Sequence, residues 1–189
     1  GTQFVGEGST SFDGGDYITV DDIPVSTSLT ISVWVYATAA GFIVNNGVDA
    51  DDKFMLMAYN AGRVEAIVRR GGTSYPLKSN DVSTLWSFNK WHHIAIVYNI
   101  DNSMTMYIDG VDDSGATSTS YGLGDQTGNM IIGGRFNSPI DTTFNGFLKN
   151  LAVWNRALSA TEIQNVMYKT YTDLSGTLSS GLVSWWALE

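Results

Sequence analysis

The 189-residue sequence has no cysteine, only 3 prolines and no apolar run long enough to span a membrane. The absence of cysteine excludes disulfide bonds and thiolate chemistry. The absence of a long apolar run excludes a transmembrane helix, and no signal peptide is visible. The scarcity of proline, beside 20 glycines, suits many tight turns between strands.

Positive charge is also scarce. Ten Lys and Arg residues face 19 Asp and Glu residues, which gives a formal net charge of -9. A nucleic-acid-binding protein needs a basic surface to displace counterions, so this class is disfavoured. Docking on anionic lipid is disfavoured for the same reason, unless a cation intervenes. Most of the acids are Asp, which is a common turn former.

Strands are predicted along most of the chain, because apolar and polar residues alternate between turn-forming residues. Segment 29–37, for example, has one aliphatic face and one face that carries Trp34 and Tyr36. The pattern predicts an all-β, antiparallel two-sheet β-sandwich of the jelly-roll type. The predicted strands are 16–22, 29–37, 53–59, 63–70, 91–99, 104–110, 129–135, 146–155 and 181–189.

One short helix is predicted near the C-terminus, from Ser159 to about Tyr171. Ser159 and Glu162 have the spacing of a capping box, in which each side chain accepts a hydrogen bond from the other residue's backbone N–H. The apolar residues that follow at helical spacing would pack on a sheet.

The segment FNGFLKNLAVWNRALSATEI, residues 144–163, resembles the closing motif of laminin-G-like, or concanavalin-A-like, jelly-roll domains. Three further motifs resemble the family in the same order: SFDGGDYITV at 11–20, LTISVWVYA at 29–37, and WHHIAIVYN with MTMYIDG within 91–110. The resemblance implies the fold strongly. It implies function only weakly, because such a fold hosts many activities.

The C-terminal segment 180–189 stands at the wrong end of the chain for this family, in which the corresponding strand comes first. One interpretation is a unit of a tandem array, whose last strand begins the following repeat. The other is a single domain over 1–189, in which the segment folds back as in a permuted unit. The second is favoured, because so apolar a segment would aggregate if exposed.

Catalysis is not predicted. The fold is related to glucanases, whose E-x-D-x-x-E pattern supplies two carboxyl groups roughly 5 Å apart, and the sequence lacks that pattern. It also lacks a G-x-S-x-G elbow. The only histidines, His92 and His93, are strand neighbours that point to opposite faces, so they cannot easily hold one metal. One of them is expected at the edge of the core and the other on a solvated or concave face. A glycoside hydrolase is therefore the least favoured alternative.

The sequence suggests two alternative calcium sites. Calcium needs roughly six to eight oxygen ligands. The resemblance implies Asp13 and Asp16 together with Asn150, which replaces the family's usual acid. Composition alone suggests Asp49 and Asp51, close to two asparagines. The alternative, that these acids only form turns, stays open.

Glycan recognition is the favoured function, because lectin sites combine aromatic rings with planar amide, carboxylate or guanidinium groups. Loop 135–141 and the loop after residue 44 are the predicted ligand rim. By contrast, Trp34, Trp91 and Trp154 are predicted in the core. The predicted ligand-binding residues are Asn45, Asn46, Tyr75, Trp86, Arg135, Asn137 and Asp141.

The sequence therefore predicts a non-catalytic carbohydrate-binding module, assisted by calcium, that acts through rim or concave-face loops. The resemblance implies a larger extracellular, cell-surface or virion-surface protein with neighbouring domains. The alternative is a structural or protein–protein adhesion domain without a sugar site.

Overall fold

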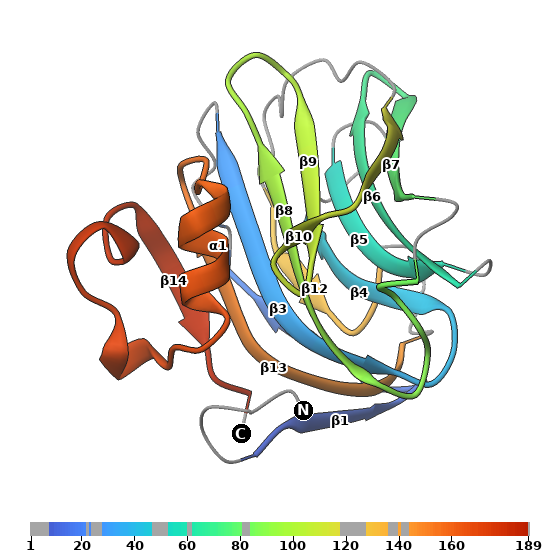
Figure 1. The fold of residues 1–189 in the computed structure, drawn as a ribbon. Coiled ribbons are helices and arrows are strands. Elements are labelled where there is room, and N and C mark those ends of the chain that lie inside the picture. Colours follow the sequence, from blue (N-terminus) through green and yellow to red (C-terminus); the bar gives the residue numbers. More distant parts are fainter. Residues whose placement is uncertain are drawn as a thin grey trace.

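The computed structural model is a sandwich of two antiparallel sheets (Figure 1). It describes residues 8–21, 23, 28–46, 53–59, 62–80, 84–117, 128–135, 140 and 144–188. The predicted all-β sandwich with one short helix is confirmed. None of the helices in these ranges is long and apolar enough to cross a membrane.

The first sheet has β13 and β3 near its centre, and β14 pairs with β13 beside the main strand order. In order it comprises β1 (Thr10–Asp13), β13 (Asn145–Trp154), β3 (Leu29–Ala37), β8 (Trp91–Tyr98), β9 (Met104–Ile108) and β10 (Val111–Asp112), with β14 (Leu182–Trp186) on β13.

The second sheet packs against one face of the first. In order it comprises β11 (Ser114–Thr117), β7 (Thr73–Ser79), β6 (Arg63–Arg70), β5 (Lys53–Tyr59), β4 (Gly41–Asn46), β12 (Met130–Ile132) and β2 (Ile18–Val20).

The main core lies between the sheets, and β3 shows how the sequence places it. Leu29, Ile31 and Val33 are buried in this core, and each such side chain stabilises the fold by roughly 1.5–3 kcal/mol. The alternate residues of β3, including Trp34, face the other side of the sheet. The predicted alternation is therefore confirmed.

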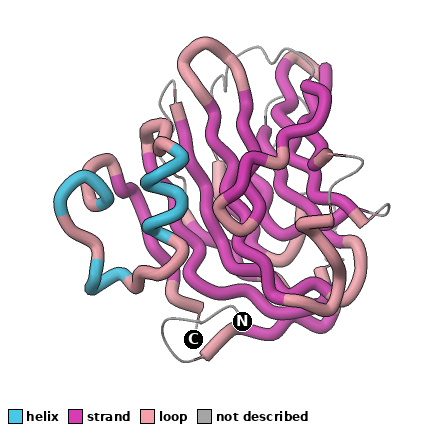
Figure 2. Tube along the Cα trace, viewed as in Figure 1, coloured by secondary structure: helices cyan, strands magenta, loops and turns pink. Residues whose placement is uncertain are grey.

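Helix α1 (Ala160–Val166) covers the outer face of the first sheet, and Figure 2 shows all helical segments on that side. The predicted capping box is present: Ser159 Oγ accepts the Glu162 N–H at 3.2 Å, and Glu162 Oε2 accepts the Ser159 N–H at 2.9 Å. A second hydrophobic cluster fills the space between helix and sheet. Its buried members are Ala95, Val97, Ala152, Trp154, Leu158, Ile163, Val166 and Leu178.

The helix is shorter than predicted, because it ends at Val166 and not near Tyr171. The Asp173 carboxylate accepts hydrogen bonds from the N–H and the Oγ of Thr170. These bonds start a separate 3-10 turn, η1 (Tyr171–Asp173), and a second one, η2 (Gly176–Leu178), follows.

The strands β1 and β14 lie end to end along one edge of β13. Strand β1 pairs with residues 145–148, and β14 pairs with residues 151–154. Between them β13 bulges at Asn150, whose N–H donates to the Ala187 carbonyl at 3.0 Å. The C-terminal strand thus pairs with β13 of the same chain, which is the arrangement that a permuted unit needs. The pairing does not test whether another repeat follows.

Candidate functional site

A row of cross-strand partners crosses four adjacent strands of the second sheet. Phe42, Met57, Glu65 and Lys78 are successive partners in the register of β4, β5, β6 and β7. The side chains of Glu65 and Lys78 point away from the main core, because the residues that alternate with them, such as Val64 and Leu77, belong to that core.

A second row runs beside the first and crosses six strands. Two of its members, Asn45 and Ile131, are buried although they point away from the main core. Other side chains therefore cover them, and this part of the outer face is closed to solvent. The row consists of Thr19, Ile131, Asn45, Met55, Ile67 and Pro76.

At one end of this face, the guanidinium of Arg135 lies over the ring of Phe42. The distance from Arg135 Cζ to the ring centroid is 4.4 Å, which is the geometry of a cation–π contact. Arg135 follows β12, so the pairing of β12 with β4 brings the two residues together. The contact orients a planar group with several N–H donors.

Toward the other end, Glu65 pairs with Lys78, at 4.0 Å between Oε1 and Nζ. Glu65 is only 6% exposed. Burial raises the pKa of the Glu65 carboxyl, and the neighbouring Lys78 ammonium opposes that shift. The pair supplies an acceptor, Glu65, about 10 Å from Phe42 at two strand spacings, and a donor, Lys78, one strand further.

This outer face therefore carries guanidinium, carboxylate and ammonium groups beside apolar side chains. Such a set can bind a ligand with both hydroxyl groups and apolar faces. Glycoside cleavage needs two close carboxyl groups, whereas Glu65 has a lysine as its partner. Within the described ranges, His, Asp and Glu form no group of three that could hold a metal ion.

Two predicted ligand residues, Asn45 and Arg135, lie on or beside this face, while three others do not. Asn45 and Asn46 end strand β4, where they are buried and not in a loop. Asn46 and Tyr75 alternate with the outward residues of β4 and β7 and therefore face the other side of the sheet.

The prediction that Trp86 belongs to the rim is wrong. Its side chain is 5% exposed and packs in the main core. The ring lies 5.0 Å from that of His92 and 6.2 Å from that of Phe88. The remaining predicted residues of both kinds, Asn137, Asp141, Asp49 and Asp51, lie outside the described residues.

The residues of the first calcium prediction are not brought together. Asp13 pairs with Asn145, which lies five residues before Asn150 on β13. Asp13 and Asn150 are therefore about 16 Å apart along the strand. Asp13 Oδ1 accepts the Gly15 N–H at 2.9 Å, and Asp16 Oδ2 accepts the Asp13 N–H at 3.4 Å. These two acids form a turn, and they do not fit one calcium ion together with Asn150.

A Ser–His–Asp arrangement, which the sequence analysis did not find, fastens segment 84–90 to the β8–β9 hairpin. His92 Nδ1 lies 2.8 Å from Asp109 Oδ2, and His92 Nε2 lies 3.4 Å from Ser87 Oγ. The Ser87 backbone N–H donates to the same Nε2 at 3.2 Å. The lone pair of His92 Nε2 thus accepts a hydrogen bond from the Ser87 backbone N–H. The arrangement therefore holds the segment in place and does not activate Ser87 as a nucleophile.

The two histidines point to opposite faces of β8, as predicted, but both are buried. Neither of them therefore lies on a solvated face. His93 is covered on the outer face of the first sheet, where its ring lies 5.4 Å from that of Trp34.

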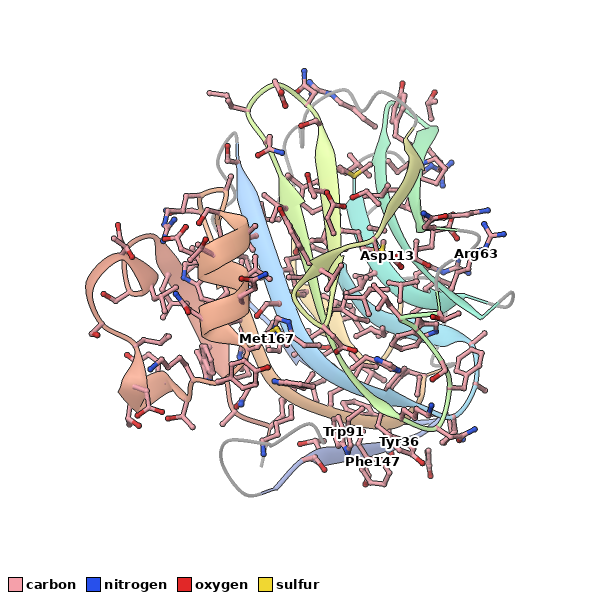
Figure 3. All side chains as sticks on the ribbon, viewed as in Figure 1. Tyr36, Arg63, Trp91, Asp113, Phe147 and Met167 are labelled. Carbon is pink, nitrogen blue, oxygen red and sulfur yellow. The ribbon has the colours of Figure 1, made fainter. Side chains whose placement is uncertain are left out.

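A half-exposed aromatic cluster lies further along the same outer face, as Figure 3 shows for Tyr36, Trp91 and Phe147. The prediction that Trp91 is in the core is wrong. The residues that alternate with it, such as Ile94 and Ile96, fill the core, so Trp91 faces outward. Strand alternation alone could have shown this.

Comparison with known proteins supports the fold. Residues 12–164 match the family described as the concanavalin A-like lectin/glucanases superfamily. A search of curated proteins finds no match.

Solved structures with the same fold share little sequence with this chain. A heptameric SAP-like pentraxin from Limulus polyphemus is 17% identical, with a TM-score of 0.66 over 95% of this chain and 90% of the other. The CBM40 of a Ruminococcus gnavus IT-sialidase, bound to alpha2,3 sialyllactose, is 18% identical, with a TM-score of 0.63 over 80% and 96%. Domain 4 of the arabinanase AbnA from Geobacillus stearothermophilus, in complex with arabinotriose, is 17% identical, with a TM-score of 0.66 over 84% and 76%.

Proposed function

Because this chain belongs to the concanavalin A-like lectin/glucanases superfamily, we propose that it is a non-catalytic module that binds glycans. The site is the outer face of the second sheet. One observation carries the proposal: the row from Arg135 and Phe42 to Glu65 and Lys78 gathers polar groups beside an aromatic ring on one face of the sheet.

The chemistry of this row matches that of a sugar. Arg135 presents planar N–H donors, Glu65 presents acceptor oxygens, and Lys78 adds a donor. Ile67 and Pro76, which are half-buried on the same face, supply apolar surface for the C–H faces of the rings. The row from Phe42 to Glu65 spans about 10 Å, which is the length of roughly two sugar rings.

The solved structures support the ligand class. Two of them are complexes with glycans, one with sialyllactose and the other with arabinotriose. Both are modules of larger carbohydrate-active enzymes, a sialidase and an arabinanase. By analogy, we place this chain in a larger extracellular, cell-surface or virion-surface protein, with glycans as its partners.

Replacement of Arg135 tests the site. We expect Arg135→Ala to weaken glycan binding roughly tenfold or more, because the variant loses the oriented N–H donors. Isothermal titration with a panel that includes sialyllactose, lactose and arabinotriose measures the effect. Arg70→Ala is the matched control, because Arg70 is an exposed arginine at the end of β6. Equal affinity of the two variants for every bound glycan would place the site elsewhere.

Calcium assistance stays a prediction, with Asp49 and Asp51 as its remaining carboxylates. If calcium binds the folded state, millimolar calcium raises the melting temperature by several degrees over excess EDTA, by mass action. Asp49→Asn with Asp51→Asn would abolish the rise, whereas Asp13→Asn with Asp16→Asn would leave it. Equal melting temperatures in calcium and EDTA would make all four acids turn formers.

The alternative is a structural or protein-adhesion domain. Its support is the aromatic cluster on the other sheet, since exposed apolar patches often mark protein contacts. A module that binds no glycan at millimolar concentration, yet associates with another protein through that cluster, would establish the alternative.

A further inference from the structure

The aromatic cluster of Tyr36, Trp91 and Phe147 is compact and comes from three adjacent strands, β3, β8 and β13. The Tyr36 ring centroid lies 5.8 Å from each of the other two, and the Trp91 and Phe147 centroids are 6.4 Å apart. Side chains two strands apart in a flat sheet would be separated by about 10 Å. Trp91 and Phe147 therefore lean toward each other over Tyr36.

The chain covers the neighbouring part of this sheet face but leaves the cluster open. One row away, Trp34 is buried, and its Nε1 donates to the Met167 carbonyl at the end of α1 at 3.0 Å. Phe147, in contrast, is 39% exposed, and Trp91 and Tyr36 are half-buried. Figure 3 shows the three rings gathered at one end of the sheet, apart from Met167. The cluster is thus an aromatic surface just beyond the helix.

The row on the other side of the cluster is polar and carries one carboxylate. Thr38 Oγ1 donates to the Asn145 carbonyl at 3.0 Å and lies 3.1 Å from Asn145 Oδ1. The exposed Asp13 lies opposite Asn145, and the exposed Ser11 continues the row of the cluster itself, opposite Phe147. Hydroxyl, amide and carboxylate groups beside aromatic rings complement a ligand that is rich in hydroxyls, and the Asp13 carboxylate disfavours an acidic one. An anionic lipid surface is disfavoured on a chain of net charge -9.

We infer that this cluster is a second glycan contact, which takes an uncharged oligosaccharide. The C–H faces of the sugar rings lie on Trp91 and Phe147, and the ring hydroxyls hydrogen-bond to the row of Thr38 and Asn145. The inference rests on the proposed function and extends it, because the cluster and the Arg135 face belong to different sheets. A module with two such contacts gains avidity on a glycan surface without any new affinity at either site.

A tryptophan-specific signal tests the inference directly. The protein has 6 tryptophans, so 5-fluorotryptophan labelling gives a short fluorine NMR spectrum in which Trp91→Phe assigns the Trp91 resonance. The probes are neutral oligomers of glucose, xylose, galactose and arabinose. We expect one of them to shift the Trp91 resonance saturably, while the resonance of the fully buried Trp154 stays in place.

Variants separate this contact from the Arg135 face. Phe147→Ala should weaken the Trp91 response roughly tenfold or more, as for an aromatic anchor in a binding site. Arg135→Ala should leave the Trp91 response unchanged. Tyr171→Ala is the matched control, because Tyr171 is an aromatic residue 62% exposed in η1. Unchanged melting temperatures would show that the variants fold.

Three results would overturn the inference. Binding that Arg135→Ala removes, with a Trp91 resonance that never moves, would refute the second contact and leave the proposed function intact. A spectrum unmoved by every neutral and acidic glycan would refute both. A Trp91 shift that depends on protein concentration alone, with a dimer in ultracentrifugation that Phe147→Ala abolishes, would make the cluster an interface between copies.

Discussion

Trp154→Ala should lower the free energy of unfolding by about 3–5 kcal/mol, a large share of the stability of a single domain. Trp154 is the last residue of β13 and is fully buried. Its ring packs against the C-terminal segment, 6.4 Å from the ring of Trp185. Its Nε1 also donates to the Leu178 carbonyl at 2.9 Å. The variant loses the packing and leaves that carbonyl without its donor. Urea unfolding measures the change.

Trp154→Phe separates the two contributions. It keeps most of the apolar contact and removes only the hydrogen bond, so we expect a smaller loss of about 1–2 kcal/mol. A loss below about 1 kcal/mol for Trp154→Ala would contradict the account. It would mean that the C-terminal segment contributes little to covering the first sheet.

Acid should destabilise the protein between about pH 6.5 and pH 4, and His93 is the expected cause. Burial lowers the pKa of His93 to about 4, although the Asp109 carboxylate opposes the shift. The unfolded chain, with a histidine pKa near 6.5, binds the proton first as pH falls. Stability is therefore complete above pH 6.5 and declines by about 1.4 kcal/mol per pH unit down to pH 4, or roughly 3 kcal/mol in all.

His93→Gln is the variant that isolates this effect, because glutamine does not titrate. Its free energy of unfolding, measured in urea from pH 7.5 to pH 4, should lack the slope that the wild type shows.

A second group acts at lower pH. The hydrogen bonds of Arg156 lower the pKa of Glu162 to about 2, so the stabilisation by Glu162 is lost as pH falls from about 4.5 toward 2. Identical slopes for wild type and His93→Gln above pH 4.5 would exclude His93 as the cause.

The sheet-level fold could be predicted because strand alternation and four family-like motifs agree along the chain. Strand β4 was missed, because Ile43 and Val44 are both in the core around a bulge and break the alternation. Strand β7 was missed because it contains Pro76 and several polar residues, which rarely signal a strand.

The candidate site was harder to predict, since it depends on strand order. Phe42, Glu65 and Lys78 are far apart in the sequence and become neighbours only through the register of β4 to β7. Arg135 was predicted as a loop residue, whereas its contact with Phe42 follows from the pairing of β12 with β4. The position of Trp86 was predicted wrongly because this residue lies in an irregular segment. In the structure its ring packs against His92, which also accepts the Ser87 N–H.

The two outer faces of the sandwich differ in a way that matters for function. The helix and the 3-10 turns cover part of the outer face of the first sheet, and the aromatic cluster lies beyond them. The outer face of the second sheet instead carries the Glu65–Lys78 pair and the Arg135–Phe42 contact. The comparisons place the chain among domains of one fold, and the choice of ligand rests on these two faces.

Backbone amide chemical-shift mapping with a glycan panel tests the central claim most directly. We expect a glycan bound at millimolar concentration or below to shift the amides of β4, β6 and β7 around Phe42, Glu65 and Lys78, together with residue 135. If no glycan in the panel shifts these amides, or if the shifts gather on the first sheet alone, the outer face of the second sheet is not the site.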